Sequence, residues 1–196
     1  MISRTGRTNV HGPIPHPVMA GIAALLLMLV LALALLAPEA RAGRTISWGS
    51  SLSSPPARSL NAPVDTAYWQ PLVAPKAGQI VAVTLWGRVV SGQPTVLFQD
   101  LRPLGGGELK VISTTQPFQL TGAIAKHTFR PINFFVHKGD HVGLATIGGS
   151  YEVFAARPSA SAFGFVGAGH DMNGSSFAGT PHHGYELLQR MTEKVG

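Results

Sequence analysis

The feature that most constrains this chain is the way its apolar residues are spaced. Downstream of Ala42, no segment of ten or more residues carries the 3.6-residue apolar period of an amphipathic helix. From about Gln79 onward, apolar residues alternate with polar or small ones, and Gly, Pro, Asp or Asn interrupts the pattern about every eight to twelve residues. With 23 glycines and 15 prolines in 196 residues, the chain is also a poor candidate for a helical bundle. We therefore expect an all-β protein, an antiparallel β-sandwich of about eight or nine strands.

The alternation also places individual strands and their inward faces. The expected strands are 79–86, 95–101, 108–114, 151–155, 162–166 and 185–191. The clearest hairpin is expected over 132–147, with its turn at Lys138-Gly139-Asp140, where the glycine supplies a positive φ. The side chains predicted to face the core are Val81, Val83, Leu85, Val96, Phe98, Val111, Phe134, Val136, Val142 and Leu144.

An apolar segment near the N-terminus predicts export. Residues 18–37 carry no charge, follow Arg4 and Arg7, and precede small residues around Arg41 that suit a signal peptidase. We expect residues 1–42 to be a signal peptide or, if uncleaved, an N-terminal membrane anchor whose only membrane contact is 18–37. The rest is then extracytoplasmic, either secreted or anchored. It divides into a Ser/Pro-rich lead-in at 43–66 and a β-sandwich domain at 67–196.

Composition and motifs exclude several classes of function. The chain has no cysteine, which rules out disulfides, thiol nucleophiles and cysteine-bound metals. It also lacks a G-x-S-x-G elbow, a Walker A motif and a G-x-G-x-x-G motif. Lys+Arg number 15 against 9 Asp+Glu, but the basic residues are scattered singly, so we expect no nucleic-acid partner. A mildly cationic surface of this kind is compatible with acidic polymers of a cell envelope.

A family resemblance rests on the run from Gly78 to Gly149. Its segments GQIVAVTLWG, TVLFQDLRP, TFRPINFFV and KGDHVGLATIGG resemble the jelly-roll β-sandwich domains of secreted bacterial proteins, which include carbohydrate-binding modules. The resemblance implies a jelly-roll-like sandwich and a carbohydrate or envelope polymer as partner. It assigns no specific family and transfers no ligand residue, because this fold hosts unrelated functions.

Histidines near one turn make up the candidate metal site. His137 and His141 flank Asp140, and imidazole and carboxylate groups are common ligands of divalent metals such as zinc. The alternative interpretation is that these are solvated histidines and a turn aspartate. We expect no other cofactor.

Aromatic residues make up the candidate ligand site. Trp86 and Phe135 are predicted to point outward, and Tyr68 and Trp69 precede the first firm strand. Flat aromatic rings on the outside of a sandwich can stack on sugars, and a neighbouring amide such as Asn133 can bind their hydroxyl groups. The alternative is that the rings form a second packing layer.

These observations favour an exported, non-catalytic binding or envelope-associated protein, with carbohydrate as the expected ligand. The rival interpretation is a secreted hydrolase or lyase that acts on polysaccharide, which needs two carboxyl groups across a cleft. A purely structural surface protein is the third alternative. The candidate acids for the rival are Asp100, Glu108, Asp140, Glu152, Asp171 and Glu186.

Overall fold

The computed structural model describes residues 43–57, 60–63, 65–166 and 173–196. These described residues belong to one compact unit. The predicted signal or anchor segment at 1–42 lies outside the described residues. Within the described part of the chain, no helix has the length and apolar character that a membrane span requires.

The described residues form twelve strands and no helix, and every strand pairing is antiparallel. The prediction of an all-β antiparallel fold is therefore confirmed, although the strands outnumber the eight or nine expected. The strands are β1 Arg44–Gly49, β2 Thr66–Trp69, β3 Gly78–Gly105, β4 Glu108–Thr114, β5 Phe118–Gln119, β6 Ala125–Phe129, β7 Phe134–Val136, β8 His141–Glu152, β9 Phe154–Val166, β10 Ser176–Ala178, β11 Thr180–Leu187 and β12 Gln189–Val195.

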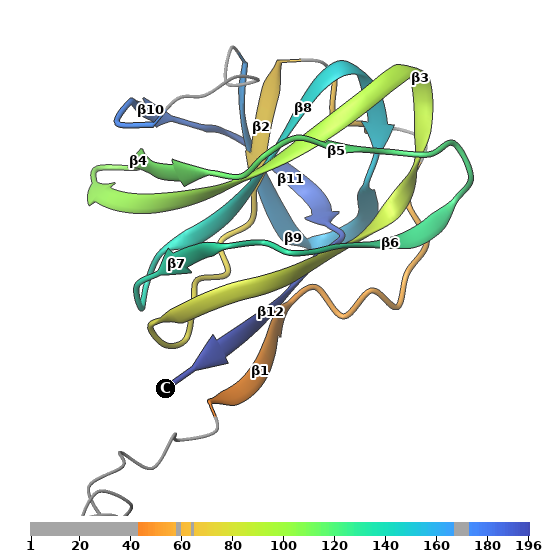
Figure 1. The fold of residues 1–196 in the computed structure, drawn as a ribbon. Coiled ribbons are helices and arrows are strands. Elements are labelled where there is room, and N and C mark those ends of the chain that lie inside the picture. The colour runs from red at the N-terminus through yellow and green to blue at the C-terminus, as the bar shows by residue number, and fades with distance from the viewer. Residues whose placement is uncertain (1–42, 58–59, 64, 167–172) are drawn as a thin grey trace, which may run out of the picture. The chain divides into compact units, whose positions relative to one another are not determined.

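The long strand β3 organises the fold. Its first part pairs with β12, β6 and β7, and together with β1 these strands make up what we call sheet A. Its second part pairs with β8, β4 and β5, and these continue into β2, β9, β11 and β10 as sheet B. Figure 1 shows β3 crossing the molecule, bending, and returning in the other direction.

The bend in β3 follows from its sequence. The predicted strands 79–86 and 95–101 are joined by a segment that contains Gly92 and Pro94. The register with β8 shifts between Val89 and Ser91 and again between Gly92 and Thr95. Bulges of this kind bend a strand and increase its twist, and Gly92 adopts the positive φ of 66° that other residues avoid. One strand can therefore serve both sheets.

The main core draws on both sheets. Ile80, Val83 and Leu85 from sheet A share one buried cluster with Phe98 and Leu144 from sheet B. This arrangement is consistent with the predicted β-sandwich. Nine of the ten predicted core residues are buried, and all nine except Val111 belong to this cluster. Val111 lies in a second cluster with Trp69, Leu101, Leu109 and Phe177.

The prediction that Val81 faces the core is wrong. Thr192 pairs with Ala82 and Glu193 with Ile80, so Val81 is an extra residue in β3 at a bulge. The extra residue reverses the alternation, and Ile80 is fully buried while Val81 is half-buried on the outer side.

The predicted hairpin over 132–147 is also wrong, although both of its strands exist. β7 pairs with β3 in sheet A, whereas β8 pairs with β3 and β2 in sheet B. The Lys138-Gly139-Asp140 turn therefore connects the two sheets. Both strands alternate because both bury every second side chain in the same core, and alternation alone does not distinguish this connection from a hairpin.

The lead-in at 43–66 is part of the fold. β1 pairs with β12 over six residues, and Ala62 forms a bridge to Tyr151. The Ser- and Pro-rich lead-in therefore contributes an edge strand to sheet A, which its composition did not predict.

Candidate functional site

The outer face of sheet A is the candidate site. We use this name for the side of β1, β12, β3, β6 and β7 that is turned away from the main core. Strand pairing arranges its side chains in rows: Thr45, Lys194, Gln79 and Phe135; Ser47, Thr192 and Ala82; Arg190, Thr84 and Thr128; and finally Trp86 and Lys126. From Gln79 to Trp86 the face extends over roughly 20 Å, at about 3.3 Å per residue.

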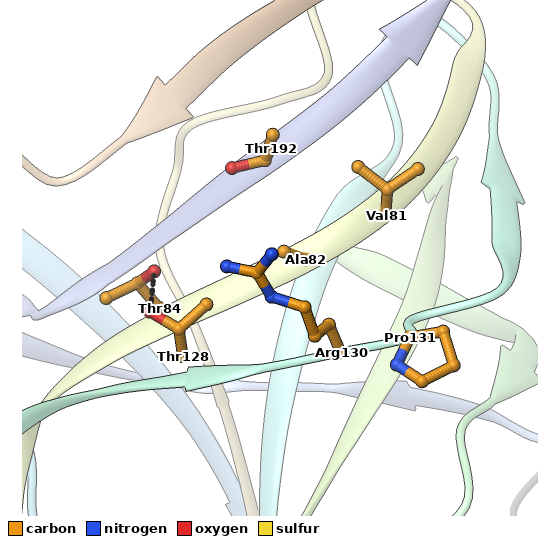
Figure 2. Close-up of a pocket in the computed structure, with 7 residues that line it drawn as sticks. All are labelled: Val81, Ala82, Thr84, Thr128, Arg130, Pro131 and Thr192. Carbon is orange, nitrogen blue, oxygen red and sulfur yellow. Dashed lines mark hydrogen bonds between the residues drawn. The ribbon is translucent and has the colours of Figure 1, made fainter.

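An open hollow of about 510 Å³ lies in the middle of this face. Its lining residues are Val81, Ala82, Thr84, Thr128, Arg130, Pro131 and Thr192. Figure 2 shows the Arg130 side chain reaching back over β3, beside Ala82 and toward the Thr84–Thr128 pair. The hydroxyl oxygens of Thr84 and Thr128 are 3.0 Å apart and share a hydrogen bond. The hollow therefore combines hydroxyl groups, a guanidinium and a small apolar floor.

The face carries positive charge without negative charge. Strand pairing places Lys126, Arg190 and Lys194 on it, and Arg130 follows β6 at its edge. Among the described residues that pairing assigns to this face, none is acidic. Glu193, in β12, is buried on the opposite side of the sheet and accepts a hydrogen bond of 2.7 Å from Trp48 Nε1.

Strand pairing places Trp86 and Phe135 at opposite ends of this outer face, but Trp86 is half-buried and also packs against the main core. The ammonium of Lys126 lies 4.6 Å from the centre of the Trp86 ring, a cation–π contact that covers that side of the ring. Phe135 is 54% exposed and meets His137 edge to face at 5.5 Å. Asn133 is exposed just before β7. These residues frame the hollow without forming a continuous aromatic platform.

Tyr68 and Trp69, the other two candidate ligand residues, are buried and do not form part of an exposed aromatic surface. Both belong to β2, whose two edges pair with β8 and β9, and its two faces pack in different hydrophobic clusters. Each side chain is only 4% exposed. Tyr68 packs edge-on against Phe154 in the main core, and Trp69 stacks on Phe163 in the second cluster. The alternative packing interpretation holds for these two rings.

The predicted metal ligands His137, Asp140 and His141 are close in sequence, but each forms hydrogen bonds with other protein groups. Arg102 donates from Nε and Nη2 to the two carboxylate oxygens of Asp140, each at 3.2 Å, and the His137 backbone N–H donates to the same group at 2.7 Å. His137 Nδ1 lies 2.6 Å from Arg102 Nη2, from which it accepts. His141 Nδ1 donates to the carbonyl oxygens of Gln70 and Leu72. Among the residues that the structure describes, no group of three His, Cys, Asp or Glu residues forms a metal site.

One carboxyl pair exists, but it is closed to solvent. Asp100 is fully buried and Asp140 is 2% exposed, and the two lie next to each other. Burial, followed by the negative charge of Asp140, raises the pKa of Asp100 to about 7. A pair with this burial cannot contact a polysaccharide. Glu152 and Glu186 form ion pairs with Arg88 and Arg157, and Asp171 lies outside the described residues.

Sequence reasoning missed the centre of this site. It placed Trp86 and Phe135 on the outward face, but it did not single out the threonines or Arg130. Recognising Thr128, Thr192 and Arg130 as neighbours requires the register of β6 and β12 against β3, which a single sequence does not provide. Comparisons with family models, curated proteins and solved structures give no match.

Proposed function

We propose that the protein is exported and binds carbohydrate without chemical turnover, through the outer face of sheet A. The observation that carries this proposal is the open hollow between Thr84, Thr128, Thr192 and Arg130 on an extended strand surface. Hydroxyl and guanidinium groups in a shallow site match the hydroxyl-rich surface of a sugar. Trp86 and Phe135 add apolar area at the two ends.

The polysaccharide hydrolase or lyase receives less support. Its two carboxyl groups would have to flank a bound glycosidic bond. The neighbouring carboxyl groups of Asp100 and Asp140 are buried, and Asp140 is held by Arg102. A binding protein needs no such pair, and this difference favours the proposed function over the enzyme.

The test of binding is an isothermal titration calorimetry experiment in which a panel of neutral and acidic polysaccharides is titrated into the purified full chain. We expect affinities in the micromolar to millimolar range, because an open face buries only part of a ligand. The double variant Thr84→Val, Thr128→Val removes both hydroxyls at nearly constant volume and should weaken binding several-fold. Thr180→Val, on β11 of sheet B, is the matched control and should bind normally.

A folded wild-type protein that binds none of the polysaccharides would refute the proposal and favour a structural surface protein. Unchanged binding by the double variant would show that the Thr84–Thr128 pair does not contribute to the binding site.

The export part of the proposal rests on the apolar segment at 18–37. Mass spectrometry of protein recovered from the host medium should detect a chain that begins near Gly43 if the signal is cleaved. Protein with an intact Met1, soluble in the cytoplasm, would contradict export.

A further inference from the structure

The charge and geometry of the hollow point to the class of glycan. We propose that the outer face of sheet A selects anionic glycans, and that Arg130 with the hydroxyls of Thr84, Thr128 and Thr192 binds their oxyanion groups. This inference rests on the proposed function and narrows it to polymers that carry carboxylate or phosphodiester groups.

The first argument is the unbalanced charge of the face. Three arginines elsewhere have carboxylate partners: Arg88 pairs with Glu152, Arg102 with Asp140 and Arg157 with Glu186. No described acid lies within ion-pair distance of Arg130, Arg190, Lys126 or Lys194. Cations without carboxylate partners on one surface raise the local concentration of anionic ligands.

The second argument is the chemistry of the hollow. A guanidinium presents several N–H donors in a planar fork that fits the two oxygens of a carboxylate or phosphate. The Arg130 fork lies over β3 beside the Thr84–Thr128 hydroxyl pair, and Thr192 presents its hydroxyl from β12 (Figure 2). Thr84 and Thr128 share a hydrogen bond, so one of their two hydroxyls donates to the other and the second can donate to a ligand, as can the Thr192 hydroxyl. The hollow therefore offers converging donors, with no carboxylate among its lining residues.

The third argument concerns the kind of polymer. Single-stranded nucleic acids are usually bound by successive aromatic rings on which bases stack. On this face Trp86 is covered on one side by Lys126, and Phe135 lies at the far end. The rows between them carry the hydroxyls of Ser47, Thr192, Thr84 and Thr128 and the guanidinium of Arg190, a composition better suited to an acidic sugar chain.

The experiment compares ligands that differ only in charge. The full chain, purified in detergent micelles, is titrated with polygalacturonate and with its fully methyl-esterified form, which has the same backbone without the negative charge. A glycerol-phosphate teichoic acid carries phosphodiester groups in place of carboxylates. A DNA duplex serves as the control for unselective binding of polyanions. The variants are Arg130→Gln and Arg190→Gln. Lys110→Gln is the control, because it removes an exposed cation from β4 in sheet B.

We expect polygalacturonate, teichoic acid or both to bind at least 10-fold more tightly than the ester. Arg130→Gln should lower that affinity roughly 10-fold, as expected for loss of a charge-assisted hydrogen bond, and should leave the affinity for the ester unchanged. Arg190→Gln should have a smaller effect in the same direction, and Lys110→Gln none. The relative affinities for the two acidic polymers identify whether carboxylate or phosphodiester is preferred.

Equal affinity for polygalacturonate and its ester, with no preference for teichoic acid, would overturn anion selection while leaving carbohydrate binding intact. DNA binding as tight as that of the acidic glycans would also overturn it, because the face would then be an unselective cationic surface. Failure to bind any glycan would refute the proposed function itself.

Discussion

Replacing Asp100 by asparagine should change how stability depends on pH. Asp100 is fully buried in β3, and no hydrogen-bond donor reaches either of its oxygens when it is ionised. When protonated it can donate to Asp140, which already accepts from Arg102 and from the His137 backbone. Burial and the charge of Asp140 raise the pKa of Asp100 to about 7, against 3.8 for a free aspartate, despite the opposing charge of Arg102.

The sign and size of the effect follow from proton linkage. Between pH 4 and 7 the folded protein holds a proton on Asp100 that the unfolded chain has released, so the free energy of unfolding falls as pH rises through this range. A difference of about three pKa units corresponds to at most about 4 kcal/mol, since one unit is about 1.4 kcal/mol. Small domains are stable by roughly 5–15 kcal/mol, so the effect is large enough to measure.

The assay is urea denaturation of wild type and Asp100→Asn at pH 4, 5, 6, 7 and 8, followed by tryptophan fluorescence. The amide can still donate to Asp140 but cannot ionise, so the two proteins should be similarly stable at pH 4. The variant should become progressively more stable than wild type up to pH 7, and the difference should then level off. Burial lowers the pKa of His141 and raises that of Glu193. Wild type and variant both contain these two groups, so their contributions to the pH dependence cancel when the two free energies of unfolding are subtracted.

Glu108→Gln is the control, because Glu108 is an exposed carboxylate at the start of β4. Its difference from wild type should not vary appreciably with pH. If the difference between Asp100→Asn and wild type were also constant, or if wild type were the more stable protein at pH 8, the account of a buried, protonated Asp100 would be wrong.

Two further predictions test the packing. Ile80→Ala should lower the free energy of unfolding by about 2–5 kcal/mol. Val81→Ala should lower it by well under half as much, because the bulge buries Ile80 and leaves Val81 half-buried. Equal losses in urea denaturation would argue against the bulge. Gly179→Ala should cost about 1–3 kcal/mol, because its Cβ would clash with the Trp69 ring, and an unchanged thermal midpoint would show that this ring is free to move.

The alternation of apolar residues predicted the fold class and most of the core, because each strand buries every second side chain. It failed at Val81, where one inserted residue reverses the alternation, and such a bulge leaves no clear mark in the sequence. It also failed at the Lys138-Gly139-Asp140 turn, whose composition suits a hairpin as well as a connection between sheets.

The candidate site was predictable only in part. The outward position of Trp86 and Phe135 follows from their place in alternating strands. The burial of Tyr68 and Trp69 does not, because the central position of β2 depends on pairing with β8 and β9, which are distant in sequence. The same limit applies to Arg130, whose neighbours come from other strands.

The measurement that tests the central claim most directly is the location of a bound acidic oligosaccharide. An oligogalacturonate would be titrated into isotopically labelled protein and followed by NMR. We predict that the largest chemical-shift changes map to Thr84, Thr128, Arg130 and Thr192, with smaller changes at Trp86 and Arg190 on the same face. Changes centred instead on the groove lined by Trp69, His141 and Phe163, or no changes at all in folded protein, would contradict the account.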